Sequence, residues 1–458
     1  MKNTILKNVE ILAFIFLFVG MFSVLAYSGD TDLHYDDALY WTLGQAYNWD
    51  CTNLAIGFRG YLLPFMFFLA YKLGKILGNQ FIGLWILSGA TFALLHTAVF
   101  RRIIGMLGFD TGDKKRTVIC GGVAGCISAL LFRGLYKYAL SDIYAFTILL
   151  LTIIIFHDII SSENIGRIRR IISVFILGFM IYGMYNIRTI YLFISVILLG
   201  VFIVYHCLSK YRKFWYEVPV MIAGLFTGMY PMIRMNRALL GITSWQIPTD
   251  GLMLVQIHAG IYTDRYATYI GDKERFSSAG VYFYDKLGQK ILEYEGIETL
   301  ETWGEYIKLV FKYPLDFIGI YTRHLISMLY PIFPNQYIKS VDKDKSFFLI
   351  LTFTLLWVCG IYLIKIYRFD KKSIILLITI LFPCLCILPG AVESRFFFGV
   401  YYLIAAYVTM GIKEVFLEVK TKKVPYIVSY AVLFCIYVAL CGYMLSGTES
   451  GTIILSGL

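Results

Sequence analysis

The chain contains repeated apolar runs that are each about as long as a membrane is thick. Runs of roughly 17 to 22 residues match the length that an α-helix needs to cross ~30 Å of hydrocarbon. Hydrophobic residues make up 59% of the 458 residues and charged residues only 16%, which excludes an ordinary soluble globular protein. The alternation typical of a membrane β-barrel is absent. The sequence therefore predicts an all-α polytopic membrane protein.

About eleven membrane-spanning helices are expected from the lengths of these runs. The predicted spans are 10–27, 81–100, 117–133, 143–160, 171–186, 189–208, 217–234, 347–367, 373–391, 396–413 and 425–445. The run 60–78 is expected to lie along the membrane interface, because Pro64 near its start and Lys72 and Lys75 near its end suit an interfacial helix. The alternative is a short true span, which would reverse the orientation of every later loop.

Lysine and arginine are concentrated in short connections between these runs. The basic connections are 101–116, 161–170, 209–215, 367–372 and 413–423. Cytoplasmic loops carry an excess of Lys and Arg, so we expect all five, and the N-terminus, on the cytoplasmic side of the plasma membrane. The net charge of +11 is then a signal of topology, and no nucleic acid is expected as a partner.

Three regions follow from this topology. Residues 1–234 are expected to form an N-terminal transmembrane module with a catalytic first loop, 28–80, and residues 347–458 the C-terminal transmembrane helices. The connection 235–346 is expected to be an extracytoplasmic loop with amphipathic helices. Within it, Thr302 and Glu305 predict a capping box. Pro314 is expected to end that helix and start another, 315–330, apolar enough to lie on the membrane or dip into it.

The first loop carries an unusual number of acidic side chains. They are Asp30, Asp32, Asp36, Asp37 and Asp50. Adjacent carboxylates in a helix point about 100° apart, so one of the pair Asp36–Asp37 can act as a base while the other holds a second group. His34, Tyr40 and Trp41 are predicted to bind a sugar or an acceptor, since aromatic rings stack on the apolar face of a sugar. The alternatives are a solvated acidic loop and aromatic residues of the interfacial belt.

Asp142 is a second acidic candidate. It follows a short loop rich in Tyr and Lys and stands where a span begins, a position in which a carboxylate is costly to bury and often functional. The alternative is a helix cap formed by Ser141 or Asp142. Both roles are compatible, and we predict that Asp142 is catalytic together with Asp36 and Asp37.

Basic side chains at the same predicted face suit a phosphate. Arg59, Arg188 and Arg395 lie at membrane level, and the planar guanidinium binds phosphate oxygens in pairs. His324 is predicted to contact the same phosphate. Glu393 is predicted to pair with Arg395 or to hold an acceptor. The alternatives are arginines that extend to lipid headgroups and a histidine that acts as a structural donor.

Nucleotide and metal motifs are missing from the sequence. It contains no Walker A loop, no dinucleotide fingerprint and no zinc motif. An activated donor is therefore more plausibly linked to a lipid than to a nucleotide. No metal site is predicted; a divalent cation, Mg²⁺ or Mn²⁺, near the aspartates is compatible with the chemistry but not required by it.

Four short motifs together resemble a known family. The chain is similar to the GT-C superfamily of membrane glycosyltransferases, in particular the bacterial relatives of protein O-mannosyltransferases and of the aminoarabinose transferase of lipid A. The motifs that carry this resemblance are YDDALYW with Asp36 and Asp37, FRGYLLP with Arg59, SDIYAFTILLL with Asp142, and ESRFFF with Glu393 and Arg395. The acidic pair is Asp-Asp where relatives often have Asp-Glu, and the usual Pro-Pro after the basic residue is missing. These departures leave the substrate and the subfamily open.

The resemblance implies a polyprenyl-phosphate-linked sugar donor and transfer on the extracytoplasmic face to a glycan, lipid or protein acceptor. In the expected mechanism Asp36 is the general base, and attack at the anomeric carbon inverts it. Asp37 or Asp142 orients a substrate, and arginines stabilise the departing phosphate.

Two other functions remain open. A flippase or transporter of a lipid-linked glycan would place charges in the middle of the membrane. A surface-polysaccharide polymerase or ligase would place its chemistry in the loop 235–346, and Asp36 would be dispensable.

Overall fold

The computed structural model divides into two compact units. The first comprises Met1–Val118, Tyr136–Pro248 and Ile375–Pro383, and the second comprises Ile119–Leu135, Thr249–Ile374 and Cys384–Leu458. The structure describes residues 2–29, 31–47, 60–161, 166–208, 215–248, 251–270, 279–329, 337–338, 346–446 and 452–455.

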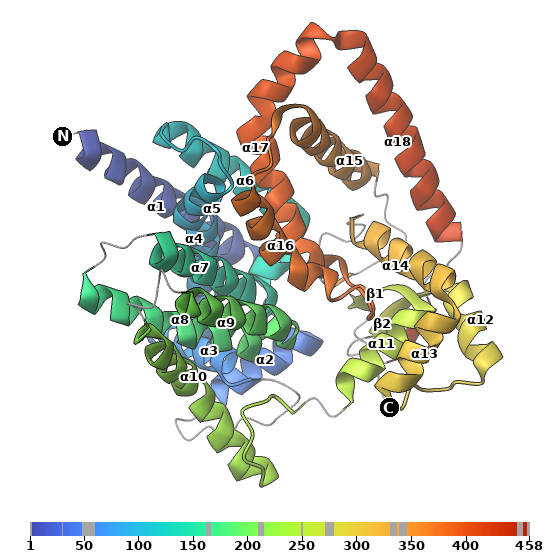
Figure 1. Cartoon of the computed structure of the whole chain (residues 1–458), viewed down its shortest axis with the longest axis horizontal. Coiled ribbons are helices and arrows are strands. Elements are labelled where there is room, and N and C mark those ends of the chain that lie inside the picture. The colour runs from blue at the N-terminus through green and yellow to red at the C-terminus, as the bar shows by residue number, and fades with distance from the viewer. Residues whose placement is uncertain are drawn as a thin grey trace. The chain divides into compact units, whose positions relative to one another are not determined.

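Unit 1 is built from helices (Figure 1). They are α1 (Lys2–Ser28), α2 (Tyr35–Gln45), α3 (Leu62–Ile76), α4 (Gln80–Leu94), the π-helical turn η1 (Leu95–Val99), α5 (Phe100–Met106), α7 (Asp142–Ser161), α8 (Arg167–Ile187), the 3₁₀ turn η2 (Thr189–Tyr191), α9 (Leu192–Cys207) and α10 (Glu217–Leu240). Helix α6 (Lys114–Lys137) contributes residues to both units.

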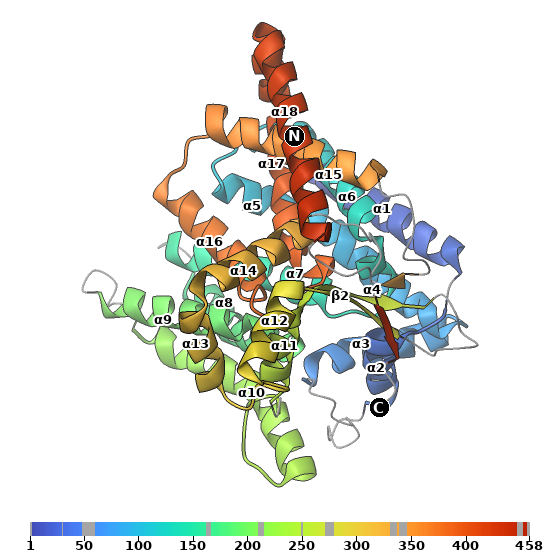
Figure 2. The same ribbon diagram turned by 90° about the vertical axis from the view of Figure 1, so that its right-hand side faces the viewer.

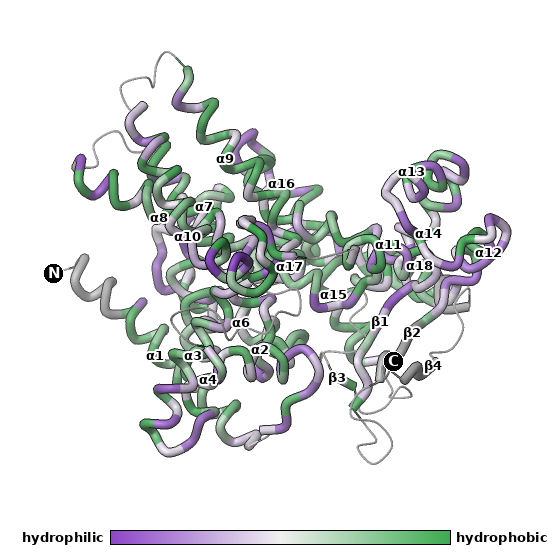
Figure 3. Tube along the Cα trace, turned by 90° about the horizontal axis from the view of Figure 1, so that it is seen from below, coloured by the Kyte–Doolittle hydropathy of each residue, from purple (hydrophilic) through white to green (hydrophobic). Residues whose placement is uncertain are grey.

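Ten of the predicted spans are confirmed as helices long and apolar enough to cross a membrane, counted over the described residues. They are Val9–Ser28, Gln80–Met106, Lys114–Lys137, Asp142–Ser161, Arg167–Ile187, Thr189–Cys207, Glu217–Leu240, Ser346–Ile366, Ser394–Thr421 and Lys423–Tyr443. In Figure 3 hydrophobic residues predominate along these helices, and hydrophilic residues gather where helices end. The chain is therefore a multi-pass membrane protein with a lipid bilayer as its environment.

Two predicted apolar segments are shorter than these ten. The span expected at 373–391 is helix α16 (Lys371–Leu385), which contains Pro383 and gives way to turns after Leu385. Proline removes a backbone donor and favours the end of a helix. The helix therefore ends before the apolar sequence does, and the predicted span was too long at its C-terminal end. Helix α3, in the run 60–78, also has 15 residues, or roughly 22 Å of length. Its interfacial position stays a prediction.

Glycines allow α8 and α10 to pack backbone against backbone. A methyl group added at Gly178 would lie 2.0 Å from the carbonyl oxygen of Met221, and one added at Gly224 would lie 2.0 Å from that of Phe175. Small residues permit such close approach between membrane helices. This contact fixes α8, whose C-terminal end carries part of the candidate site.

A buried charge cluster joins the N-terminal ends of α8 and α10. Glu217, at the start of α10, forms an ion pair with Arg170 near the start of α8. It also lies 3.0 Å from Nε2 of His206 at the end of α9. All three side chains are buried, so their mutual contacts replace the water that each has lost.

Unit 2 contains the long connection and the C-terminal helices. Its elements are α11 (Leu252–Tyr262), β1 (Thr263–Tyr269), β2 (Ala279–Tyr284), α12 (Lys286–Glu295), α13 (Trp303–Lys312), α14 (Pro314–Leu329), β3 (Tyr337–Ile338), α15 (Ser346–Ile361), the π-helical turn η4 (Tyr362–Ile366), the 3₁₀ turn η5 (Ser394–Phe397), α17 (Phe398–Thr421), α18 (Lys423–Ser446) and β4 (Thr452–Leu455). Helix α16 contributes residues to both units. We refer to residues 251–338 as the insert.

The insert contains a β-sheet, which the all-α expectation did not include. Its strand order is β3-β1-β2-β4, with β1 antiparallel to β2 and parallel to β3. Strand β4 comes from the C-terminal segment and pairs antiparallel with β2. Figure 2 shows β2 beside the helices of the insert. The C-terminal segment is therefore tied to the insert.

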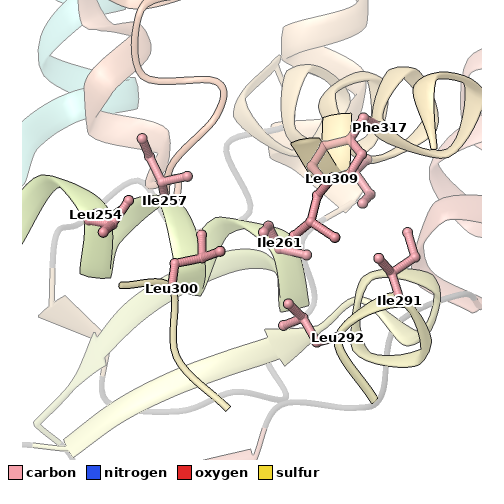
Figure 4. Close-up of a cluster of buried hydrophobic side chains, with 9 residues drawn as sticks. Leu254, Ile257, Ile261, Ile291, Leu292, Leu300, Leu309 and Phe317 are labelled. Carbon is pink, nitrogen blue, oxygen red and sulfur yellow. The ribbon is translucent and has the colours of Figure 1, made fainter. Parts of the chain in front are cut away.

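The helices of the insert share a small hydrophobic core. In Figure 4 side chains from α11, α12, α13 and α14 converge, together with Leu300 from the loop before α13. The core residues are Leu254, Ile257, Ile261, Ile291, Leu292, Leu300, Leu309, Phe317 and Ile320. The predicted capping box of Thr302 and Glu305 is confirmed at the start of α13, and Pro314 begins α14 as predicted.

Candidate active site

The acidic pair Asp36–Asp37 lies in the first turn of α2. Asp37 is fully buried, and its Oδ1 accepts a hydrogen bond of 2.9 Å from the backbone N–H of His34. This bond closes the N-terminal turn, where a carboxylate also meets the positive end of the helix dipole. Asp36 is half-buried one position earlier. Asp37 therefore fixes the turn, while Asp36 presents the more accessible carboxylate.

Asp142 and Arg188 form an ion pair between two helix ends. Asp142 is the first residue of α7, and Arg188 follows the last residue of α8. Nη1 of Arg188 also donates to Oγ of Ser141 at 3.5 Å. The Asp142 side chain is 6% exposed and the Arg188 side chain 17%. From the sequence, Asp142 was predicted to be catalytic and Arg188 to bind phosphate. The structure places the two side chains in direct contact.

Helix α2 reaches the same place through its polar side chains. The hydroxyl of Tyr40 donates to Oγ of Ser141 at 3.4 Å. The ring of His34 meets that of Tyr138 edge to face, with centroids 6.0 Å apart. Nζ of Lys137 lies 4.9 Å from the centroid of the Tyr138 ring. The start of α2, the loop before α7 and the turn after α8 therefore meet at one end of unit 1.

Asn186 joins the start of α3 to this end. Its Oδ1 accepts a 2.8 Å hydrogen bond from the backbone N–H of Leu62, and its Nδ2 donates to the hydroxyl of Tyr182 at 3.3 Å. A methyl group on Gly60 would lie 2.0 Å from the Asn186 carbonyl oxygen, so the two segments are in direct backbone contact. Arg59 precedes this contact and lies outside the described residues.

Trp41 belongs to the packing of α2. Its side chain is fully buried. The indole stacks on Phe81 of α4, with centroids 5.6 Å apart, and meets Phe67 and Tyr71 of α3 at 5.9 Å and 6.2 Å. The ring therefore holds α2 against α3 and α4. Its contact with a sugar stays a prediction.

The remaining candidates belong to unit 2. Glu393 pairs with Arg395 at 3.0 Å, as one of the two predicted roles for Glu393 required, and both are buried. His324 is fully buried, with Nδ1 2.6 Å from the carbonyl oxygen of Leu388 and Nε2 2.8 Å from that of Thr263. These bonds tie α14 to β1 and to the turn after α16.

Other buried charges lie close to His324. Both carboxylate oxygens of Asp264 lie 2.7 Å from the hydroxyl of Ser327. Burial raises the pKa of the Asp264 carboxyl, and Arg265, the Ser327 hydroxyl and His324 oppose that rise. Asp285 caps α12 through the N–H groups of Leu287 and Gly288 and forms an ion pair with Arg323. We call Asp264, Asp285, Arg323 and His324 the insert charge cluster.

Metal ligands do not gather in the part of the chain that the structure describes. Within those ranges no group of three or more His, Cys, Asp or Glu side chains is arranged to hold a metal ion. Asp30 and Asp50 of the acidic loop lie outside them. Asp32 is exposed in the segment before α2.

The sequence did not single out Tyr138 or Asn186. Tyr138 lies in a short loop among other tyrosines and Asn186 lies near the end of α8, so neither gave a stronger signal than many other residues of its type. No protein-family model, curated protein or solved structure matches this chain. What can be said of function therefore depends on the chain's own residues and their geometry.

Proposed function

We propose that this chain is an integral membrane glycosyltransferase that moves a sugar from a polyprenyl-phosphate-linked donor to an acceptor on the extracytoplasmic face. The observation that supports it best is the meeting of the Asp36–Asp37 turn with the Asp142–Arg188 ion pair at one end of unit 1. A multi-pass protein with acidic and basic side chains at a helix end is suited to a substrate whose carrier is a lipid. The GT-C resemblance supplies the reaction class.

The reaction needs a base at the acceptor. In the proposed step the Asp36 carboxylate accepts the proton of an acceptor hydroxyl as its oxygen forms a bond to the anomeric carbon of the donor sugar. The bond from that carbon to the phosphate oxygen breaks, and the phosphate keeps the electron pair. Attack opposite the leaving group inverts the anomeric centre. Asp36 suits this role because it is half-buried and adjacent to the turn that Asp37 fixes.

The departing lipid phosphate needs positive charge. Arg188 is a cation at this end of unit 1, held by Asp142 and Ser141. A guanidinium oriented before the reaction stabilises developing charge at little cost of reorganisation. Arg59, Arg395 and His324 stay predicted phosphate ligands, and His34, Tyr40 and Glu393 stay predicted ligands of the sugar or acceptor.

Eleven crossings are part of the proposal, and contacts within unit 2 support them. After α15 and α16, the chain returns to the insert, where the N–H of Ala391 donates to Gln256 and the N–H of Tyr266 donates to Val392, each at 2.9 Å. After α17 and α18 it returns again, as β4 pairs with β2. Each return requires an even number of crossings, which supports a crossing by α16 although it is short.

The orientation follows from charge. The connection between α15 and α16 is then on the side opposite the insert. It contains Arg368, and Lys371 and Lys372 follow at the start of α16. Basic connections favour the cytoplasm, which supports an extracytoplasmic position for the insert.

The test compares two aspartates of the first loop. Membranes that contain wild type, Asp36→Asn or Asp32→Asn receive a pool of radiolabelled polyprenyl-phosphate sugars, and loss of label from the lipid is measured at matched protein levels. We expect Asp36→Asn to lower turnover by about 10²-fold or more, the usual contribution of a general base. Asp32→Asn is the matched control, because Asp32 is exposed and has no role in the proposed mechanism.

Unchanged turnover in Asp36→Asn would overturn the proposed site. Wild-type protein that moves labelled lipid across the membrane without releasing its sugar would indicate a flippase. Chain elongation that survives Asp36→Asn would indicate a polymerase or ligase with its chemistry in the insert.

A further inference from the structure

An apolar row runs along the outside of α13 and α14. Trp303, Ile307 and Phe311 are spaced four residues apart on α13, so they lie on one face of the helix. Leu315 and Ile318 are exposed on α14, which begins two residues after the last residue of α13, and we include them in the row. Phe311 is 81% exposed and Leu315 80%. Single exposed apolar side chains are common, but several together mark a surface that contacts something other than water.

The row cannot turn inward, because the opposite face of each helix is already occupied. Leu309 of α13 and Phe317 of α14 lie in the hydrophobic core of the insert. Both helices are therefore fixed with their large apolar side chains pointing outward.

Two hydrogen bonds show how deep α14 lies. The carbonyl oxygen of Leu329, the last residue of α14, accepts from the hydroxyls of Tyr401 and Tyr437. Tyr401 lies roughly 10 Å along the apolar helix that begins at Ser394, and Tyr437 lies roughly 14 Å before the end of α18 at Ser446. The C-terminal end of α14 is therefore inside the ends of two membrane-spanning helices.

The direction of α14 indicates how deep the rest of the helix lies. In both Figure 1 and Figure 2, α14 runs crosswise to α18 rather than alongside it. A helix that crosses a span obliquely is tilted toward the plane of the membrane. Its outer face then meets lipid, unless another molecule covers it.

We propose that the row Trp303, Ile307, Phe311, Leu315 and Ile318 is embedded in the adjacent leaflet, at the boundary between headgroups and acyl chains. Tryptophan and large aliphatic side chains on one face of a helix are typical of such embedding. Lys308, exposed beside the row on α13, is placed to extend its ammonium group to the headgroups. The insert is thereby fastened to the lipid surface, whatever reaction the chain catalyses.

Quenching of tryptophan fluorescence by lipid tests this directly. The purified full chain is placed in nanodiscs of phosphatidylcholine whose acyl chains carry bromine near the headgroups, and emission is compared with nanodiscs of unbrominated lipid. A Trp303→Phe parent then receives a single new tryptophan, either by Phe311→Trp on the row or by Lys308→Trp on the polar flank of the same helix. Both positions are exposed, so neither change disturbs the core.

We expect the fluorescence lost to brominated lipid to be at least about twofold greater for Phe311→Trp than for Lys308→Trp. The native Trp303 signal, taken as the difference between wild type and Trp303→Phe, is expected to be quenched like that of Phe311→Trp. This second measurement stands even if a new tryptophan disturbs folding. Equal quenching at 311 and 308, or no quenching of Trp303, would overturn the proposal.

Discussion

The end of unit 1 that carries Asp36 and the insert charge cluster both bring acidic and basic groups together, but they use them differently. At the end of unit 1 Asp36 is half-buried, and Arg188 keeps part of its side chain exposed. In the insert charge cluster, Asp264 and Asp285 are almost fully buried and bonded to a hydroxyl, to backbone N–H groups or to an arginine.

The difference distinguishes a site from a scaffold. A charge that is buried and fully hydrogen-bonded by its own fold contributes to stability or specificity of structure, since its removal leaves partners without their bonds. A charge at a helix end that retains exposure can exchange one partner for a ligand. We therefore expect substitutions at the end of unit 1 to lower transfer, with a loss of stability where a buried partner is left unpaired. Substitutions of Asp264 or Asp285 in the insert charge cluster should affect folding and leave transfer per folded molecule unchanged.

Breaking the Asp142–Arg188 pair should have the largest effect on stability. Arg188→Met leaves a largely desolvated carboxylate without its ion-pair partner, which costs about 3 to 5 kcal/mol. The double variant Arg188→Met with Asp142→Leu should recover most of that loss but no transfer activity. Thermal unfolding in detergent and the label-release assay measure the two effects. A double variant that regains transfer would show that neither charge takes part in the reaction.

Asp285→Ala should destabilise the insert by about 3 kcal/mol, because Arg323 loses its buried partner. Asp285→Asn is the matched control, since it retains an oxygen for the cap of α12. Its loss of stability should be about 1 kcal/mol smaller than that of Asp285→Ala. Turnover per folded molecule should be unchanged in both. Loss of turnover without loss of stability would move the chemistry into the insert.

Gly60→Ala should act on both properties. The new methyl group would meet the Asn186 carbonyl oxygen, and the resulting separation of α3 from the end of α8 should cost about 1 to 3 kcal/mol and lower transfer. Gly200→Ala in α9 is the control, because nothing lies within 4 Å of its new methyl group. Equal stability of the two variants would show that the backbone at Gly60 or Asn186 can shift to accommodate the methyl group at little cost.

Much of the helical architecture follows from local sequence pattern. The ten confirmed spans needed only apolar length, and the start of α13 needed only the spacing of Thr302 and Glu305. The end of α16 and the sheet of the insert were missed. The strands are short, and β4 lies far along the chain from its partner β2.

The candidate site was only partly accessible to sequence reasoning. Asp142 and Arg188 were each chosen from their residue type and place at a helix end, but nothing local shows that they pair across 46 positions. Tyr40 and Ser141 are 101 positions apart. Such contacts depend on how helices pack, and a periodic pattern reports which face of a helix is buried but not which helix covers it.

The smallest predicted effect is a pH dependence in the insert. Hydrogen bonds from Lys312 and Tyr313 lower the pKa of Glu295. Stability that depends on the charged form is present above the ordinary glutamate pKa of about 4.3 and is lost as the pH falls through the lower folded-state pKa. Glu295→Gln should thus be slightly less stable than wild type at neutral pH, and the difference should narrow in acid. A difference in unfolding temperature that does not change with pH would contradict this.

The most direct test of the account compares Asp36→Asn with Asp264→Asn in the same purified, reconstituted protein. Turnover of a polyprenyl-phosphate sugar per folded molecule and the unfolding temperature are measured for each. The account predicts that Asp36→Asn loses about 10²-fold or more in turnover with its unfolding temperature unchanged. It predicts that Asp264→Asn changes the unfolding temperature and keeps its turnover. The reverse result would contradict the assignment of the reaction to the end of unit 1.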